Sequence, residues 1–317
     1  MATYKTANAV GEKESLSSVI SKIDPSETPL FSNAKKEVVK GVFHEWQVQE
    51  LASASATNYQ NEGADYSYVN PTATTRLGNY CQISANAGSI SGTLDVVDKA
   101  GRDKETAYVK VIKGLEQRRD INKYLYSNTA RSASDPRKTA SLITWITNAD
   151  FSTAGTTSAV ATGDGSDTAT LSGNDRALTL ALIDNAMKSA FDDGGKPDML
   201  CLSPSNKVAF SDLSSGSVVS NELHMTSAKE MSIIGSASIY LTDFGELSAV
   251  VDRSANNSEI FLVDSDYYSI GHLPNRMMQT VDIAPTGDAT KFAILSEWCL
   301  IIKAPKAHGA VFDLSTS

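Results

Sequence analysis

The segment from Gly41 to Ser84 constrains the fold more than any other part of the chain. Two strand-like runs, residues 41–51 and 75–84, flank more than twenty residues of mainly Ala, Ser, Asn, Thr, Tyr and Gly. The intervening residues include almost no aliphatic side chains that could form a core. Because a two-stranded arm of this kind is marginally stable at best by itself in water, we expect it to lie against another surface.

The residues before this arm also lack a core of their own. Residues 12–23 place Leu16 and Ile20 on one apolar stripe of a helix that is too short to be stable alone. An extended segment with two prolines follows and leads into the arm. Since a compact domain rarely contains so long a segment without its own core, we expect contacts outside the chain to order it.

Composition excludes several classes of protein. No run approaches eighteen apolar residues, so we expect no membrane-spanning helix. The net charge of −9 disfavours nucleic-acid binding through the overall charge of the chain. Cys81, Cys201 and Cys299 are far apart and form no CxxC motif, so we interpret them as buried thiols in a reducing compartment.

The rest of the chain predicts a mixed α+β fold. Residues 101–131 have the strongest helical pattern, with interspersed charges that indicate a solvated face rather than a nucleic-acid surface. Residues 132–174, rich in Ser, Thr, Ala and Gly, resemble a surface excursion. A helix, a buried strand at 198–204 and a second helix then form a layered unit. The chain returns through strands and ends in a long apolar strand at 292–305.

Motifs for catalysis or for a cofactor are not found. None of the four histidines pairs at a metal-ligand spacing, and there is no nucleophile elbow, phosphate-binding loop or dinucleotide-binding pattern. The Gly-Asp-Gly-Ser-Asp stretch at 163–167 occurs once, whereas calcium-binding turns of that type repeat, so we interpret it as a solvent loop. We therefore expect no catalytic, cofactor-binding or metal-binding residues and no enzymatic activity.

The order of these parts resembles that of the major capsid proteins of tailed bacteriophages, which have what is called the Johnson fold. A short helix, an extended arm, a two-stranded loop, a long helix, a helix–strand–helix unit and a strand-rich return follow one another along nearly the whole chain. The stretch PSETPLFSNA at 25–34 looks like a turn near the start of many such proteins, in which Thr-Pro precedes apolar residues.

The resemblance implies how the chain is divided. Residues 1–40 would be an N-terminal arm and residues 41–92 an extended loop, and both would spread over neighbouring subunits. Residues 93–174 and 275–317 would form a peripheral domain that contains the long helix and the surface excursion. Residues 175–274 would form an axial domain whose tips meet around five-fold and six-fold axes.

The resemblance also implies the function and the partners. The chain would self-assemble into pentamers and hexamers of the icosahedral shell around packaged phage DNA, in the host bacterial cytoplasm, and end in the virion. Its partners would be further copies of itself, portal and scaffold proteins, and a cement or decoration protein, with no sequence-specific contact to DNA and no membrane. Some relatives cross-link subunits through a lysine of the extended loop. This chain has no lysine between Lys40 and Lys99, so we expect no such bond.

Aromatic and apolar side chains of the arm and the loop are the expected contacts between subunits, because buried aromatic groups dominate interface energetics. These residues are Leu16, Ile20, Phe31, Phe43, Trp46, Tyr59, Tyr66, Tyr68 and Tyr80. We expect the substitution Trp46→Ala to impair assembly more than it impairs folding of the subunit.

Two other interpretations stay open at this point. An encapsulin, the shell protein of a cellular nanocompartment, has the same fold without DNA, but encapsulins have a shorter extended loop and a cargo pocket that the sequence does not reveal. An uncharacterised hydrolase would need a cluster of titrating residues in a pocket, and a surface adhesin would usually show strand repeats or a secretion signal. The sequence shows none of these patterns.

Overall fold

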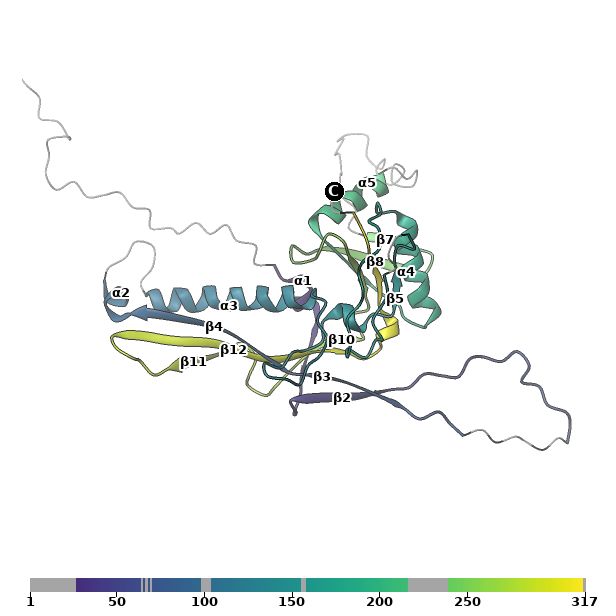
Figure 1. Cartoon of the computed structure of the whole chain (residues 1–317), viewed down its shortest axis with the longest axis horizontal. Helices are drawn as coiled ribbons and strands as arrows, with labels where there is room; N and C mark the ends of the chain where they lie inside the picture. Colours follow the sequence, from purple (N-terminus) through teal and green to yellow (C-terminus); the bar gives the residue numbers. More distant parts are fainter. Residues whose placement is uncertain are drawn as a thin grey trace, which may run out of the picture.

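The computed structural model describes residues 27–63, 65, 68, 70–97, 104–154, 158–215 and 239–315. In this part of the chain a long arm of helix and sheet extends from a rounded lobe, and a two-stranded hairpin projects on the other side (Figure 1). The expected helix at 12–23, with Leu16 and Ile20, lies outside the described residues, as does Tyr66. No helix of the described residues is long and apolar enough to cross a membrane.

Strand β12 is the centre of the long sheet that forms the arm. It pairs with β4 on one side and with β10 and β11 on the other, all antiparallel, and β1 adds in parallel to β10. Residues 296–302 of β12 are completely buried, which confirms the predicted apolar strand. The strands are β1 (Lys35–Val38), β4 (Gln82–Ser91), β10 (Tyr268–His272), β11 (Gln279–Ile283) and β12 (Ala289–Ile302).

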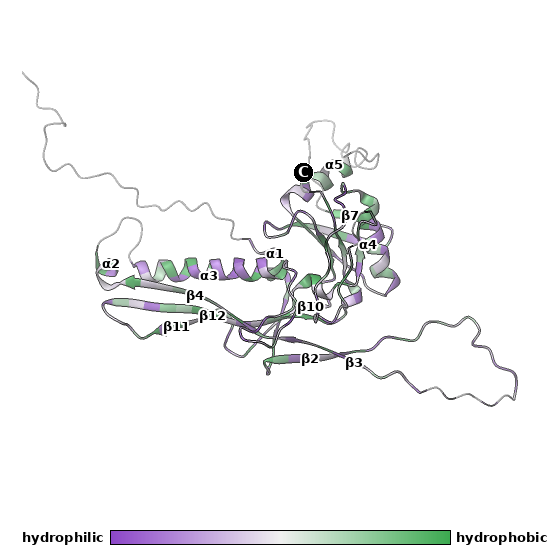
Figure 2. Ribbon diagram, in the orientation of Figure 1, coloured by the Kyte–Doolittle hydropathy of each residue, from purple (hydrophilic) through white to green (hydrophobic). Residues whose placement is uncertain are grey.

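Helix α3 (Glu105–Leu125) covers one face of this sheet, and hydrophilic and hydrophobic residues alternate along it (Figure 2). Val109 of the helix packs on Phe292 and Ile294 of β12. The helix ends earlier than predicted because the Tyr126 backbone leaves helical geometry, with φ −88° and ψ 2°. Two short helices, α1 (Pro29–Asn33) and α2 (Gly92–Val96), flank the two ends of α3.

The lobe contains a second sheet in the order β5-β13-β9-β6-β8-β7. Helix α4 (Leu180–Asp192) packs on it through Ile183 and Met187, and α5 (Pro204–Ser215) follows β6. This arrangement confirms the predicted helix–strand–helix unit. The strands are β5 (Asn148–Asp150), β6 (Met199–Leu202), β7 (Ile239–Thr242), β8 (Gly245–Val251), β9 (Ile260–Val263) and β13 (Gly309–Val311). Strands β5 and β13 also belong to this sheet. The sheet therefore includes residues before and after the segment 175–274, which is the expected axial domain.

The predicted surface excursion at 132–174 is wrong for its central part. Leu142–Trp145 form a 3-10 turn that is fully buried in the main hydrophobic core. Hydroxyl groups make this burial possible, because they satisfy backbone groups that a loop would otherwise leave unpaired. Thr139 Oγ1 accepts a hydrogen bond from the Leu300 N–H at 3.2 Å, and Ser141 Oγ accepts one from the Thr129 N–H at 3.0 Å.

The two-stranded hairpin consists of β2 (Phe43–Val48) and β3 (Thr75–Tyr80), which pair antiparallel over their whole length. This pairing confirms the two strands predicted on either side of the polar segment. The expected loop 41–92 nevertheless includes β4, whose ten residues belong to the long sheet. The described residues between β2 and β3 are exposed to solvent.

Candidate assembly surfaces

The base of the hairpin is fixed to the core of its own subunit by Asn79, which is completely buried. Its Nδ2 donates a hydrogen bond to the carbonyl of Leu300 at 2.7 Å, and its Oδ1 accepts one from the Ala140 N–H at 2.8 Å. The Arg131 guanidinium also donates to the carbonyl of Gly78. These bonds connect β3 to β12 and to the segment before the buried 3-10 turn, so the hairpin starts from a defined position.

Several expected intersubunit residues instead pack within their own chain. The ring of Trp46 lies 5.4 Å from that of Trp145, centroid to centroid, and Phe43 lies 4.5 Å from Tyr80. Phe31 is only 3% exposed. Phe31 and Trp46 therefore contribute to the core of their own subunit, and their contact with a neighbouring subunit stays a prediction.

Phe31 lies beneath two cations, which explains why an aromatic residue follows the Thr-Pro turn. The ammonium of Lys36 is 4.0 Å from the centroid of its ring, and the guanidinium of Arg118 is 5.8 Å away. Burial lowers the pKa of Lys36 to about 8, and the neighbouring charge of Arg118 acts in the same direction. The motif therefore fastens the start of the described chain to α3.

The distal part of the hairpin combines exposed aromatic side chains with negative charge. Tyr59 is 79% exposed and Tyr68 is 95% exposed. The charged residues of the segment 51–75 are Glu62 and Asp65, whereas Glu45 and Glu50 at the base form ion pairs with Arg76 and Lys306. Large exposed aromatic groups on an acidic projection are typical of a surface that is buried in a complex.

The long sheet has an open face on the side opposite α3, and we call it the open sheet face. Residues that are directly opposite one another in paired strands share a face of the sheet. Val281, Ala293 and Ala87 therefore form one row on this face. The neighbouring rows are Ile283, Lys291 and Ser89 on one side, and Gln279, Leu295 and Ala85 on the other.

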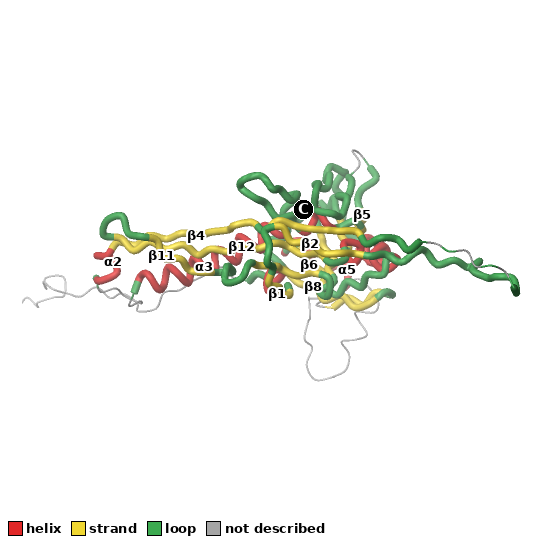
Figure 3. The backbone as a smooth tube through the Cα atoms, turned by 90° about the horizontal axis from the view of Figure 1, so that it is seen from below, coloured by secondary structure: helices red, strands yellow, loops and turns green. Residues whose placement is uncertain are grey.

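The open sheet face carries exposed apolar side chains along the arm. Val281 and Ile283 are 40% and 46% exposed, and Ala85 and Ala87 are exposed as well. Figure 3 shows β4, β12 and β11 side by side, seen from the side away from α3. Beyond Ile83, this face of β4 carries only the small side chains of Ala85, Ala87 and Ser89, so another element of structure could approach the backbone closely there.

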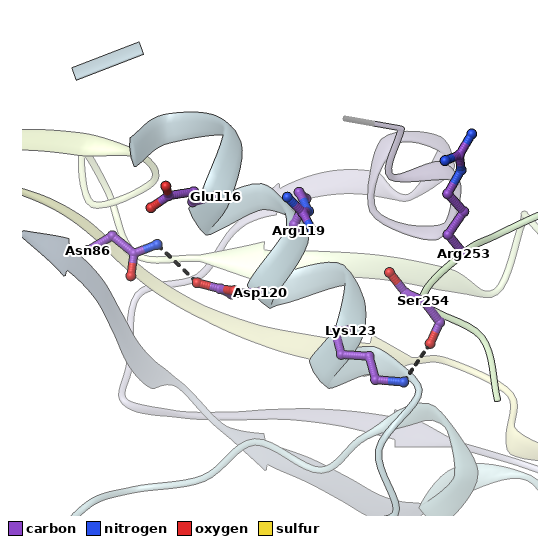
Figure 4. Close-up of a pocket in the computed structure, with 7 residues that line it drawn as sticks. All are labelled: Asn86, Glu116, Arg119, Asp120, Lys123, Arg253 and Ser254. Carbon is purple, nitrogen blue, oxygen red and sulfur yellow. Dashed lines mark hydrogen bonds between the residues drawn. The ribbon is translucent and has the colours of Figure 1, made fainter. Parts of the chain in front are cut away.

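A polar groove of about 460 Å³ lies where α3, β4 and the loop after β8 meet (Figure 4). Asn86 donates a hydrogen bond to Asp120 at 2.9 Å, and Lys123 donates one to the carbonyl of Ser254 at 2.9 Å. Glu116, Arg119 and Arg253 complete the lining. Because both signs of charge are present, the groove suits a polar chain segment better than an apolar ligand or a simple anion.

Metal binding finds no support in the described part of the chain, where no three His, Cys, Asp or Glu side chains are placed to hold an ion. In the Gly-Asp-Gly-Ser-Asp loop the Asp164 carboxylate accepts hydrogen bonds from Thr162 and from Ser166. The Asp164 carboxylate is therefore engaged in hydrogen bonds within the loop itself.

The comparison with known families decides between the remaining classes. Residues 2–315 match the family described as SU10 major capsid protein. The chain belongs to the SU10 major capsid protein family. Its function is therefore to form a capsid shell, in a family of structural proteins that is not a class of enzymes. The resemblance seen in the sequence is confirmed.

Other capsid proteins agree with this assignment. The major capsid protein of Escherichia phage Phieco32 is 32% identical over 122 residues, which are 38% of this chain and 35% of that protein. The chain therefore matches only about a third of the length of that relative. A cyanophage A-1(L) capsid structure has a TM-score of 0.67 at 12% identity, with 98% of both chains covered.

Two further solved structures share the fold. The structure of phage G gp27 major capsid proteins with gp26 decoration proteins has a TM-score of 0.57 at 10% identity, with 95% of each chain covered. The holo-SrpI encapsulin complex from Synechococcus elongatus PCC 7942 has a TM-score of 0.54 at 9% identity, with 94% of this chain and 93% of that chain covered. At such identities these likenesses show the fold alone, and they confirm the α+β capsid fold.

The open sheet face was missed in the sequence. Its signal is the alternation in β4, where Ile83, Ala85 and Ala87 interleave with the polar Ser84 and Asn86. This pattern predicts two different faces of a strand, but only the register with β12 and β11 shows which face α3 covers.

Proposed function

We propose that the chain assembles as pentamers and hexamers into the icosahedral shell of a tailed-phage virion. In this assembly the hairpin is the extended loop, and it lies across the open sheet face of a neighbouring subunit. The proposal rests on the presence of two exposed, complementary surfaces in the same chain. Each subunit has a tyrosine-bearing projection with Glu62 and Asp65 and a sheet face with exposed apolar side chains.

The two surfaces fit in shape and in charge. Alanine side chains of β4 leave room for the rings of Tyr59 and Tyr68, which are 79% and 95% exposed in the single subunit. Lys291 lies in a row of the same face and is a positive partner for the acidic hairpin. Association of this kind stabilises segments that have no core of their own.

The other segments of the chain have further roles in the proposed assembly. The arm built on α3 and the long sheet would be the peripheral domain, and the lobe would be the axial domain around the five-fold and six-fold axes. The part of the expected arm before residue 27 would cross neighbouring subunits, with Leu16 and Ile20 as contacts, whereas α1 and β1 belong to the subunit itself. Assembly would take place in the host cytoplasm with portal and scaffold proteins, and DNA would be packaged without sequence-specific contacts. A decoration protein, which the phage G capsid structure contains, is a further candidate partner.

Negative-stain electron microscopy with light scattering tests this function directly. We expect the purified chain to give closed shells, tubes or capsomers, and we expect their mass to exceed that of the subunit many times. Packaged DNA in particles from infected cells would support the virion, whereas protein cargo without DNA would indicate a nanocompartment. A monomer that forms no particles, even with its scaffold protein, would contradict the proposal.

A further inference from the structure

Two of the three cysteines meet at the point where the hairpin joins the long sheet. Cys81 lies between Tyr80, the last residue of β3, and Gln82, the first residue of β4. Gln82 is directly opposite Trp298 of β12. One step further along the two antiparallel strands therefore places Cys81 beside Cys299.

Both cysteines are completely buried and pack in one small cluster with Val39 and Ile301. Each thiol shifts the pKa of the other, downward for Cys81 and upward for Cys299. The Cys81 thiol also faces the carbonyl of Gly41, with 3.7 Å between sulfur and oxygen. The shared cluster and the strand register therefore bring the two side chains to the same place in the core.

The spacing of the strands suits a covalent bond. Directly opposite residues of an antiparallel pair have Cα atoms about 4.5 to 5.5 Å apart. A disulfide needs a Cα separation of about 4.4 to 6.8 Å. A pair at the usual spacing of antiparallel strands is therefore within the range that a disulfide can bridge.

We propose that Cys81 and Cys299 form a dithiol that oxidises to a cross-strand disulfide and thereby locks the base of the hairpin to β12. The oxidant is a low-molecular-weight disulfide such as oxidised glutathione. A thiolate at Cys81 attacks one sulfur of the oxidant and releases one thiol, which leaves a mixed disulfide. The Cys299 thiolate then attacks the Cys81 sulfur and releases the second thiol. Two S–H bonds are lost, one S–S bond forms, and the oxidant takes up two electrons and two protons.

The pKa shifts of the two thiols favour attack by Cys81 before attack by Cys299. The hydrogen bond from Cys299 lowers the pKa of the Cys81 thiol, whereas the contact with Cys81 raises the pKa of Cys299. Since the thiolate is the nucleophile, Cys81 reacts first. Because both sulfurs are buried, the reaction requires the base of the hairpin to open transiently.

The third cysteine provides an internal control. Cys201 is completely buried in β6 of the second sheet, and burial raises the pKa of its thiol to about 12. It belongs to a different part of the core from the Cys81–Cys299 pair. Oxidation should therefore consume two thiols of the chain and spare this one.

Thiol counting and peptide mapping test the proposal. The folded chain is incubated with oxidised glutathione, alkylated in denaturant and analysed by mass spectrometry. We expect one alkylated residue, Cys201, and a tryptic peptide pair that links Cys81 to Cys299 within one chain. Dithiothreitol should restore all three free thiols. Three free thiols after exposure of the folded chain, or a link that joins two chains, would overturn the proposal.

Cysteine variants distinguish oxidation of the Cys81–Cys299 pair from nonspecific oxidation of the chain. Cys201→Ser should form the same linked peptide, whereas Cys299→Ala should stop at a glutathione adduct on Cys81 or remain unmodified. The alanine variant fills the apolar cluster without introducing a polar group, and circular dichroism checks that it folds. The oxidised wild-type chain should also unfold at a higher temperature than the reduced chain, because a disulfide restricts the unfolded state. No rise in that temperature for a chain shown to carry the link would mean that it does not lock the hairpin.

Discussion

The aromatic residues of the hairpin divide into two kinds according to what they touch. Trp46 packs on Trp145 and on the core of its own subunit. Tyr59 and Tyr68 project from the hairpin and are largely exposed. The first kind positions the hairpin, and the second kind is available for another subunit.

Substitution by alanine should affect subunit stability at the first kind of residue and shell assembly at the second. We expect Trp46→Ala to destabilise the subunit by about 2 kcal/mol, because a partly buried indole loses its packing. We expect Tyr59→Ala to change subunit stability by less than about 0.5 kcal/mol but to reduce the yield of shells. Urea denaturation of subunits and electron microscopy of assembled material measure the two effects. Full shell yield from Tyr59→Ala together with Tyr68→Ala would contradict the assignment.

His308 makes the stability of the subunit depend on pH. The residue is completely buried, and its Nδ1 accepts a hydrogen bond from the Asp264 N–H at 3.1 Å. Burial lowers the pKa of His308 to about 4, whereas an exposed histidine titrates near about 6.5. Between these values the unfolded chain binds a proton that the folded chain does not bind, so stability falls as the pH decreases.

The expected size of this effect can be measured. We expect the His308 contribution to make the subunit about 2 kcal/mol less stable at pH 5 than at pH 7.5. His308→Asn keeps an oxygen acceptor for the Asp264 N–H but cannot titrate, so it should lose this part of the pH dependence. Other groups titrate in both proteins, and the difference between their urea unfolding curves isolates His308. Equal pH dependence in the two proteins would rule out this role.

Among elements, the base of the hairpin depends on Asn79. We expect Asn79→Ala to cost about 2 to 4 kcal/mol, because the buried Leu300 carbonyl and Ala140 N–H lose their partner. The exposed Asn58 of the hairpin loop provides a matched control, and Asn58→Ala should unfold at the wild-type urea concentration. Equal unfolding midpoints for the two variants would show that Asn79 does not hold the hairpin.

The open sheet face offers a second test among elements. We expect Ala87→Glu to prevent shell formation while the subunit stays folded, because a carboxylate on this face would have to be desolvated on docking. Ala107→Glu places the same side chain on the exposed surface of α3 and should leave assembly unchanged. Circular dichroism of both variants measures folding of the subunit, and electron microscopy measures shell formation. Normal shells from Ala87→Glu would exclude the face as an interface.

Elements with a regular apolar period could be predicted from the sequence, and the others could not. The long strand β12, the hairpin strands and the helices around β6 follow from runs of apolar or alternating residues. The short apolar run at Leu142–Trp145 was assigned to a surface excursion because its Ser and Thr neighbours suggest solvent, whereas their hydroxyl groups bind buried backbone. The open sheet face depends on strand register, which composition does not specify.

On the scale of the whole molecule, a buried carboxylate joins the arm to the lobe. Asp252, at the end of β8, is 1% exposed and accepts hydrogen bonds from Asn122 Nδ2 at 2.7 Å and from the Tyr126 hydroxyl at 3.1 Å. Asn122 also accepts a hydrogen bond from the Phe31 N–H at 3.0 Å. These contacts connect the end of α3 to the second sheet, so arm and lobe keep one relative orientation.

In the proposed assembly the hairpin is the element that reaches other copies. Its base is held by buried hydrogen bonds, and its loop exposes tyrosines and negative charge. The family assignment explains why a chain would keep such a projection. The central claim is therefore specific, namely that the hairpin loop of one subunit lies on the open sheet face of the next.

Site-specific photo-cross-linking in assembled shells tests this claim most directly. A benzophenone amino acid replaces Tyr59, and shells are assembled from a mixture of isotopically light and heavy subunits before irradiation. Mass spectrometry should find Tyr59 peptides joined to peptides of β4 or β12, with mixed isotope pairs that prove a link between two copies. Links only within one copy, or links that also form in unassembled subunits, would contradict the account.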